Sequence, residues 1–285
     1  MRPKASEQIP TIRSQSAMEY LMTYGWAILI IAVVLGALFQ LGVFNSSSFS
    51  PRAPPGACQV FRPSGPGTVT NINLMGVCTG QLPQYVAQFP GSASSNIIVQ
   101  DSNIFTSASS GTLAVWFSPS VAITPADPSS HEFISKNTLV VGIDTANSDG
   151  RIEVRGPSPR PATSQSTWNV QWYQATVTWG SSGYVLYING QSAGTSIDTF
   201  AFLSPSGSLV FGKTWKGNLA NAQVYNTSLS ANQVQALYLE GIGGAPMKLQ
   251  NLAGWWPLNG NANDYSGNNN NGVPTAVTFT SQYGK

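Results

Sequence analysis

Residues 184–194 read YVLYINGQSAG, and this stretch indicates the fold of most of the chain. The run of aromatic and β-branched residues from Tyr184 predicts a strand, and Asn189-Gly190 directly after it is a strong signal for a hairpin turn. Similar short strand patterns lie on both sides of it, over 113–117, 138–143, 151–155, 174–179, 209–211 and, as the last strand, 222–225. Short strands separated by turns roughly every ten residues predict a mainly β protein built as an antiparallel sandwich.

Composition narrows the class of protein. The chain has 285 residues, of which only 8% are charged, and its formal net charge is +2. This weak charge indicates neither nucleic acid nor an acidic surface as a partner. With 42% hydrophobic and 11% aromatic residues the chain can build a core, and its length allows one β domain with an appendage.

The order of the motifs resembles that of laminin-G-like, concanavalin A-like jelly-roll domains. The matching pieces are VAQFPGS (86–92), GTLAVWFSP (111–119), STWNVQWYQATVTW (166–179), YVLYINGQ (184–191) and GNLANAQVYNTSLSANQVQALY (217–238). The last piece contains a predicted short helix with Ser230 as its N-cap. The resemblance implies a jelly-roll sandwich, which we place at residues 58–285.

The C-terminal segment 254–285, which begins GWWPLNGNANDYSG, resembles the usual first segment of the same family. A truncated second repeat is one explanation, but so few residues could not bury a core of their own. We favour circular permutation, in which the segment folds back and completes the sheet. Permutation predicts that Trp255 or Trp256 packs in the core and that Lys285 ends near Tyr85 and Val86.

The N-terminal part has a different character. No charged residue occurs between Glu19 and Arg52, and residues 20–44 are almost wholly apolar. As a helix, residues 15–44 would be about 45 Å long, enough to cross a bilayer core of about 30 Å. The basic residues before it, at 2, 4 and 13, predict a cytoplasmic N-terminus, and residues 45–57 read as a Ser/Pro linker.

Three interpretations of this segment compete: a cleaved secretory signal, a plain signal anchor and a prepilin signal. The apolar run is too long for the first, and the second leaves the unpaired acid Glu19 unexplained. The string QSAMEYLMTYGWAILIIAVV (15–34) closely resembles the class III signal peptide of archaeal type IV pilins. The resemblance implies that a prepilin peptidase removes the leader 1–14 by cutting between Ser14 and Gln15, and that Glu19 pairs with a neighbouring subunit's amino terminus.

These resemblances imply a structural subunit of an archaeal type IV pilus-like filament. Copies of the chain would pass from the cell membrane, as single-pass proteins, into an extracellular surface filament that displays the sandwich for adhesion or surface contact. The alternative is a membrane-anchored, non-polymerising adhesin that binds surface glycans. We do not expect an enzyme, since the acids are scattered and glycosidases need a closely spaced carboxylate pair.

Other residues carry narrower predictions. Cys58 and Cys78, both in the first external segment, predict one disulfide. Asn45 and Asn226 begin N-glycosylation sequons.

The laminin-G-like resemblance implies a structural calcium held by Asp264, with Asn221 as a second candidate where relatives carry acids. The alternative is that Asp264 bonds its own backbone in a turn. No other cofactor is expected. His131 is expected on a loop or the surface, and the strand aromatics Trp116, Trp172, Trp179 and Tyr187 are expected in the core.

Overall fold

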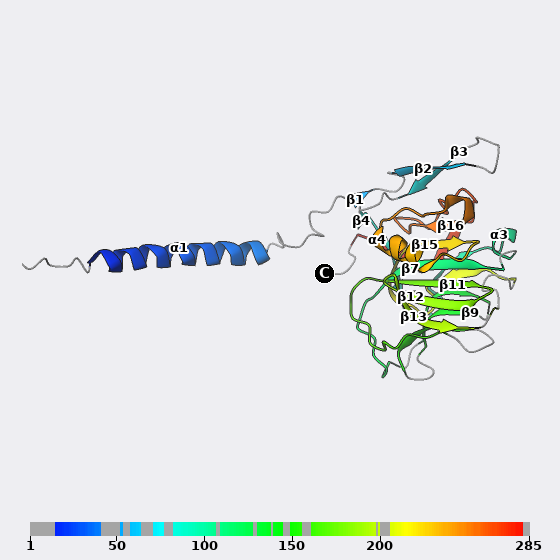
Figure 1. Cartoon of the computed structure of the whole chain (residues 1–285), viewed down its shortest axis with the longest axis horizontal. Coiled ribbons are helices and arrows are strands. Elements are labelled where there is room, and N and C mark those ends of the chain that lie inside the picture. The colour runs from blue at the N-terminus through cyan, green and yellow to red at the C-terminus, as the bar shows by residue number, and fades with distance from the viewer. Residues whose placement is uncertain are drawn as a thin grey trace, which may run out of the picture. The chain divides into compact units, whose positions relative to one another are not determined.

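The computed structural model describes residues 15–40, 52–53, 58–63, 71–76, 82–106, 109–127, 130–137, 139–144, 149–155, 161–197, 199 and 206–281 (Figure 1). The chain divides into two compact units, Met1–Ser50 and Pro51–Lys285, which we describe one at a time.

The first unit contains the helix α1 (Gln15–Gln40). Large apolar side chains are exposed on all its sides: the four consecutive residues Ile28, Leu29, Ile30 and Ile31 are 64%, 54%, 57% and 57% exposed. Within the residues described, no helix has both the length and the apolar character needed to cross a membrane. Of the apolar helix expected over residues 15–44, the structure describes the part Gln15–Gln40.

The second unit is a β-sandwich made of two antiparallel sheets (Figure 1). The smaller sheet has six strands in the order β10 (Arg151–Arg155), β9 (Leu139–Asp144), β8 (His131–Lys136), β14 (Leu209–Phe211), β6 (Asn96–Val99) and β17 (Gly272–Thr275). The larger sheet has the order β13 (Gln191–Ser196), β12 (Gly183–Ile188), β11 (Tyr173–Gly180), β7 (Gly111–Pro119), β15 (Lys216–Tyr225), β5 (Val86–Pro90) and β18 (Thr278–Thr280), with β16 (Leu252–Trp256) also paired to β15. The mainly β sandwich predicted from the sequence is confirmed.

Smaller elements complete the unit. They are a parallel pair of β1 (Arg52–Ala53) with β4 (Leu82–Pro83), an antiparallel pair of β2 (Cys58–Pro63) with β3 (Asn71–Gly76), the helices α3 (Asn103–Thr106) and α4 (Ala231–Leu239), and the 3-10 turn η1 (Leu249–Asn251).

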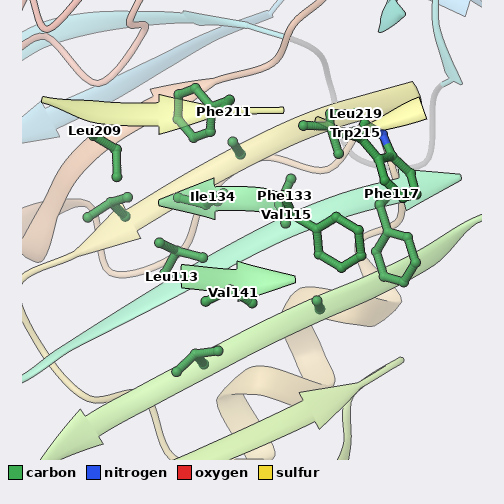
Figure 2. Packing of buried hydrophobic residues seen from close by; sticks show 14 of the residues in the cluster. Leu113, Val115, Phe117, Phe133, Ile134, Val141, Leu209, Phe211, Trp215 and Leu219 are labelled. Atoms are coloured by element: carbon green, nitrogen blue, oxygen red, sulfur yellow. The ribbon is translucent and has the colours of Figure 1, made fainter. Parts of the chain in front are cut away.

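The core lies between the two sheets and follows the two-residue period of the strands. On β7, Leu113, Val115 and Phe117 face the smaller sheet and are fully buried (Figure 2). Phe117 stacks on Phe133 of β8 with ring centroids 4.3 Å apart, and Trp215 packs edge-on against the same Phe133 at 4.8 Å.

The helix α4 lies against the outer face of the larger sheet, where β7 and β12 present Ala114 and Tyr187 (Figure 1). Its side chains Val234 and Leu237 are buried in this second cluster. The predicted N-cap Ser230 is confirmed, and its backbone N–H donates to Gln233 Oε1 at 3.0 Å.

The C-terminal segment belongs to both sheets. β16 pairs with β15, β17 with β6 and β18 with β5, so that Thr280 lies opposite Val86. Trp255 and Trp256 are both fully buried, as predicted; residues 282–285, including Lys285, lie outside the described residues. The expectation that strand 222–225 is the last one is wrong, because it is the end of the ten-residue β15 and three strands follow it. Circular permutation stays our interpretation of how this order arose.

Candidate functional site

Several connections meet at one end of the sandwich, where β5 and β7 end and β15 begins. Ser120, just after β7, donates its backbone N–H to the carbonyl of Lys216 at 3.2 Å. Thr214 Oγ1 donates to the carbonyl of Ser130 at 2.6 Å, which ties the approach to β15 to the approach to β8. Ile123 and Trp168 exchange two backbone hydrogen bonds of 2.9 Å. These bonds hold the connections in place, so the surface between them is preorganised for binding.

A cleft of about 380 Å³ opens between these connections, and we call it the larger cleft. Its volume lies within the range common for ligand sites, about 300–1,000 Å³. Hydrophobic walls come from Pro90, Val121 and Ile123, and the polar side chains lining it are Asp127, His131, Thr214 and Lys216.

Asp127 and His131 form a pair inside the larger cleft. His131 Nε2 lies 3.2 Å from Asp127 Oδ2, and the exposed fractions of the two side chains are 6% and 29%. The imidazole packs edge-on against Trp215, with ring centroids 5.8 Å apart. His131 Nδ1 is buried and has no hydrogen-bond partner among the described residues. Because a carboxylate only accepts, Nε2–H of His131 donates to Asp127 Oδ2.

The expectation that His131 lies on a loop or the surface is therefore wrong. It is the first residue of β8 and is only 5% exposed, because the ring turns inward against Trp215. Sequence reasoning missed its pairing with Asp127. The available signal was the spacing of four residues between an aspartate and the single histidine of the chain.

A second cleft of about 190 Å³ lies next to the first, and we call it the smaller cleft. The two share Pro90 and Lys216. Its other polar lining residues are Gln88, Ser120 and Thr278. Thr278 Oγ1 lies 3.4 Å from Gln88 Oε1. The smaller cleft therefore continues the polar surface across the end of β5 to the turn before β18.

Gly91 fixes the position of Lys216 between the clefts. Its φ of +88° belongs to the left-handed region, which favours glycine. A Cβ at this position would lie 2.9 Å from Lys216 Cβ and 3.3 Å from Lys216 Cγ. The aliphatic part of the lysine can lie against the backbone here only because residue 91 has no side chain.

These groups can bind a polar ligand. The carboxylate of Asp127 accepts hydrogen bonds from hydroxyls, while a hydroxyl, an amide and an ammonium donate them. Glycosidic hydrolysis needs two carboxylates on either side of the bond, and among the residues that the structure describes Asp127 is the single acid that lines the two clefts. The arrangement therefore favours binding over hydrolysis.

Two further acids do come together on the outer face of the smaller sheet. Glu132 and Glu153 both pair with Arg155, at 3.7 Å from Nη2 and 3.9 Å from Nε respectively. Arg155 Nη2 also donates to Ser130 Oγ at 3.2 Å. The arginine therefore links both glutamates to the residue before His131.

The two calcium candidates lie in hydrogen-bond networks that organise the backbone. Asp264 Oδ1 accepts from the N–H groups of Trp255 and Ser266 at 3.0 and 2.8 Å, and Oδ2 accepts from that of Asn270 at 2.9 Å. This is the turn role that we gave as the alternative. Calcium binding there stays a prediction.

Asn221, the other candidate, is buried and has its own protein partners. Its Nδ2 donates to the carbonyl of Gly244 at 2.9 Å, and its Oδ1 accepts from Trp255 Nε1 at 2.8 Å. Among the described residues, no group of three or more His, Cys, Asp or Glu side chains is placed to hold a metal ion.

The remaining predicted residues are placed only in part. Gln15 and Glu19 belong to the backbone of α1 and Cys58 to that of β2, but their side chains lie outside the described residues, as do Ser14, Asn45 and Cys78 altogether. Asn226 is described, follows β15 and donates its backbone N–H to the carbonyl of Asn251 at 2.8 Å. Processing, the disulfide and glycosylation stay predictions.

The strand aromatics divide between the two faces of the larger sheet. Trp179 lies in the core between the sheets, as expected. Trp116 and Tyr187 are buried on the outer face, where Tyr238 of α4 stacks on Trp116 at 5.5 Å. Trp172 is partly buried beside Trp116.

Comparison with known proteins bears on this fold. Residues 91–235, just over half of the chain, match the family model described as the concanavalin A-like lectin/glucanases superfamily. The chain belongs to this superfamily. The matched residues include Gly91, Asp127, His131 and Lys216 of the two clefts. No curated protein matches the chain.

Among solved structures, a candidate carbohydrate-binding protein from Bacteroides ovatus is similar, with a TM-score of 0.56 and 16% sequence identity. The alignment covers 70% of this chain but only 61% of that protein. A pentraxin resembling serum amyloid P, from Limulus polyphemus, aligns with a TM-score of 0.43 and 16% identity over 69% of this chain and 94% of its own. Domain 4 of an extracellular arabinanase from Geobacillus stearothermophilus, solved with arabinotriose, aligns with a TM-score of 0.43 and 18% identity over 64% and 82%. At these identities the likeness shows the fold alone.

Proposed function

We propose that this protein binds carbohydrate, and that the glycan lies in the two clefts at the end of the sandwich. The observation that carries the proposal is the pair of a buried His131 and a partly exposed Asp127 in a cleft with Thr214 and Lys216 on its lining. A fixed carboxylate can accept two sugar hydroxyls at once, and ligand sites typically combine such a group with hydrophobic walls. The Bacteroides ovatus protein of similar fold is described as a candidate carbohydrate binder, which is in keeping with this proposal.

Asp127→Asn tests the proposal in the purified full-length chain. Binding is first sought on a glycan array, and each hit is then measured by calorimetry. Loss of a charge-assisted hydrogen bond weakens binding by about tenfold to a hundredfold. The control is Asp149→Asn, the same substitution at an aspartate that is 41% exposed and does not line either cleft. Absence of any hit, or equal affinity of the wild type and Asp127→Asn, would overturn the proposal.

A second function, subunit of a type IV pilus-like filament, is favoured by α1. Trp26, Ile28 and Val33 are 65%, 64% and 64% exposed, and a helix that is apolar on all sides needs lipid or other helices to cover it. Under this proposal the chain first resides in the cell membrane and then in a surface filament that displays the glycan-binding sandwich. The protein partners are the prepilin peptidase and copies of the chain itself.

Mass spectrometry of the cellular protein tests the filament proposal. The expected mature N-terminus is Gln15, and Glu19→Gln should abolish filaments in sheared surface material. A mature protein that begins at Met1 or beyond Phe44, or filaments of normal yield from Glu19→Gln, would contradict it.

A further inference from the structure

We infer that the ligand of this site is an anionic glycan, whose acidic group lies in the smaller cleft beside Lys216 while neighbouring hydroxyls lie in the larger cleft. The inference rests on the proposed carbohydrate binding and adds the class of ligand and the orientation in which the glycan binds.

The charge of the smaller cleft points to an anion. Lys216 is the one charged residue among the described residues on its lining, and Gln88, Ser120 and Thr278 add neutral polar groups. Because Thr278 Oγ1 lies within 3.4 Å of Gln88 Oε1, the carbonyl end of that amide has a partner and its NH₂ end can donate to a ligand. A carboxylate or a sulfate ester accepts hydrogen bonds from ammonium, amide and hydroxyl donors together.

Lys216 is held where an anion can reach it. Its aliphatic part lies against Gly91, and the residue lines both clefts. It is exposed and forms no ion pair with any residue that the structure describes. A lysine whose position is set by packing and whose charge has no acidic partner gains more from an anionic ligand than a freely rotating one, because less side-chain entropy is lost on binding.

Asp127 in the larger cleft sets the orientation of the bound glycan. Asp127 carries a negative charge there and repels an acidic group, but it accepts hydroxyls. His131 keeps that carboxylate oriented by the contact of 3.2 Å. An acidic group is therefore excluded from the larger cleft and favoured in the smaller one, while the adjoining sugar's hydroxyls face Asp127.

The test uses the full-length chain on an array of uronate-containing, sulfated and neutral oligosaccharides. We expect the hits to be anionic, and each is measured again after carboxyl reduction or desulfation, which also distinguishes a uronate from a sulfate ligand. Lys216→Met should lower the affinity for the anionic form by about tenfold to a hundredfold and leave that for the neutralised form unchanged. Lys213→Met is the matched control, since Lys213 is exposed in the same connection and does not line either cleft.

The possible outcomes distinguish the proposal of an anionic ligand from the proposal of carbohydrate binding. Neutral hits that are weakened by Asp127→Asn but not by Lys216→Met would overturn the anionic ligand and leave carbohydrate binding intact. Equal losses in Lys213→Met and Lys216→Met would also overturn it, because the effect would then be one of overall charge. No binding to any glycan would overturn both.

Discussion

Replacing Trp256 by alanine tests whether the C-terminal segment is part of the sandwich core. Trp256 is fully buried, and its ring lies 5.1 Å from that of Phe211 and 6.3 Å from that of Phe105. Its Nε1 donates to the carbonyl of Asn270 at 2.8 Å, so the same side chain also fixes the turn before β17. Gly254 leaves room for the ring, because a Cβ there would overlap it.

The size of the effect follows from the buried area. A buried aromatic side chain removes about 150–250 Å² from water, which at about 25 cal/mol per Å² corresponds to about 4–6 kcal/mol. The Cβ that alanine retains reduces the loss, while the cavity and the lost hydrogen bond increase it, and measured Trp→Ala changes in cores are about 3–5 kcal/mol. We expect the free energy of unfolding to fall by about 4 kcal/mol, a large part of the stability of an ordinary domain.

Urea denaturation of the full-length chain, followed by far-UV circular dichroism, measures this change. Trp26→Ala is the matched control, because Trp26 is 65% exposed on α1 and its loss should leave the unfolding of the sandwich unchanged. A decrease of less than about 1 kcal/mol in the free energy of unfolding of Trp256→Ala would refute the reasoning, since replacing a buried tryptophan by alanine typically lowers it by about 3–5 kcal/mol. It would mean that the segment is not packed as described.

Three further predictions concern stability. Lys136 is fully buried, and its Nζ donates to Asp101 Oδ1 at 2.7 Å and to the carbonyl of Gly207 at 2.6 Å. Lys136→Met should therefore lower the free energy of unfolding by about 2–3 kcal/mol in the same denaturation assay. A decrease below about 0.5 kcal/mol would contradict this prediction. Partial burial raises the pKa of Asp101, but the hydrogen bonds from Lys136 and the Gly207 N–H outweigh it, so the net pKa lies below the ordinary value of 3.8. The pair therefore stabilises the fold above about pH 4 and loses that contribution as the pH falls through the lowered pKa. Denaturation curves between pH 7 and pH 2 should show a larger loss of stability for the wild type than for Lys136→Met, in which only the backbone hydrogen bonds to Asp101 remain. Gly91→Ala places a side chain at a φ of +88° and against Lys216, so it should lower the free energy of unfolding by about 1–2 kcal/mol. It should also weaken glycan binding as Lys216→Met does, and unchanged binding would show that the position of Lys216 does not matter.

The sandwich could be predicted because its signals are local. The apolar run of residues 113–117 predicts a strand, and the structure places these residues in β7. Ser230 and Gln233 are three residues apart, so the start of α4 is equally visible in the sequence. The packing of both C-terminal tryptophans follows from an apolar strand that has no other core to join.

The site could not be predicted in the same way. Asp127 and His131 are close in sequence, but whether a histidine at the start of a strand turns inward depends on Trp215, which arrives from another part of the chain. Lys216 reaches its place only because β15 pairs with β5 and sets it opposite Pro90, beside Gly91.

What the sequence by itself determined is the class of fold and the start of α4, because strand patterns, turns and capping act over a few residues. Only the tertiary structure decided which residues meet at the end of the sandwich. The two clefts combine side chains from positions 88 to 278, and their convergence depends on strand order and register, which are set by long-range packing and not by any local pattern.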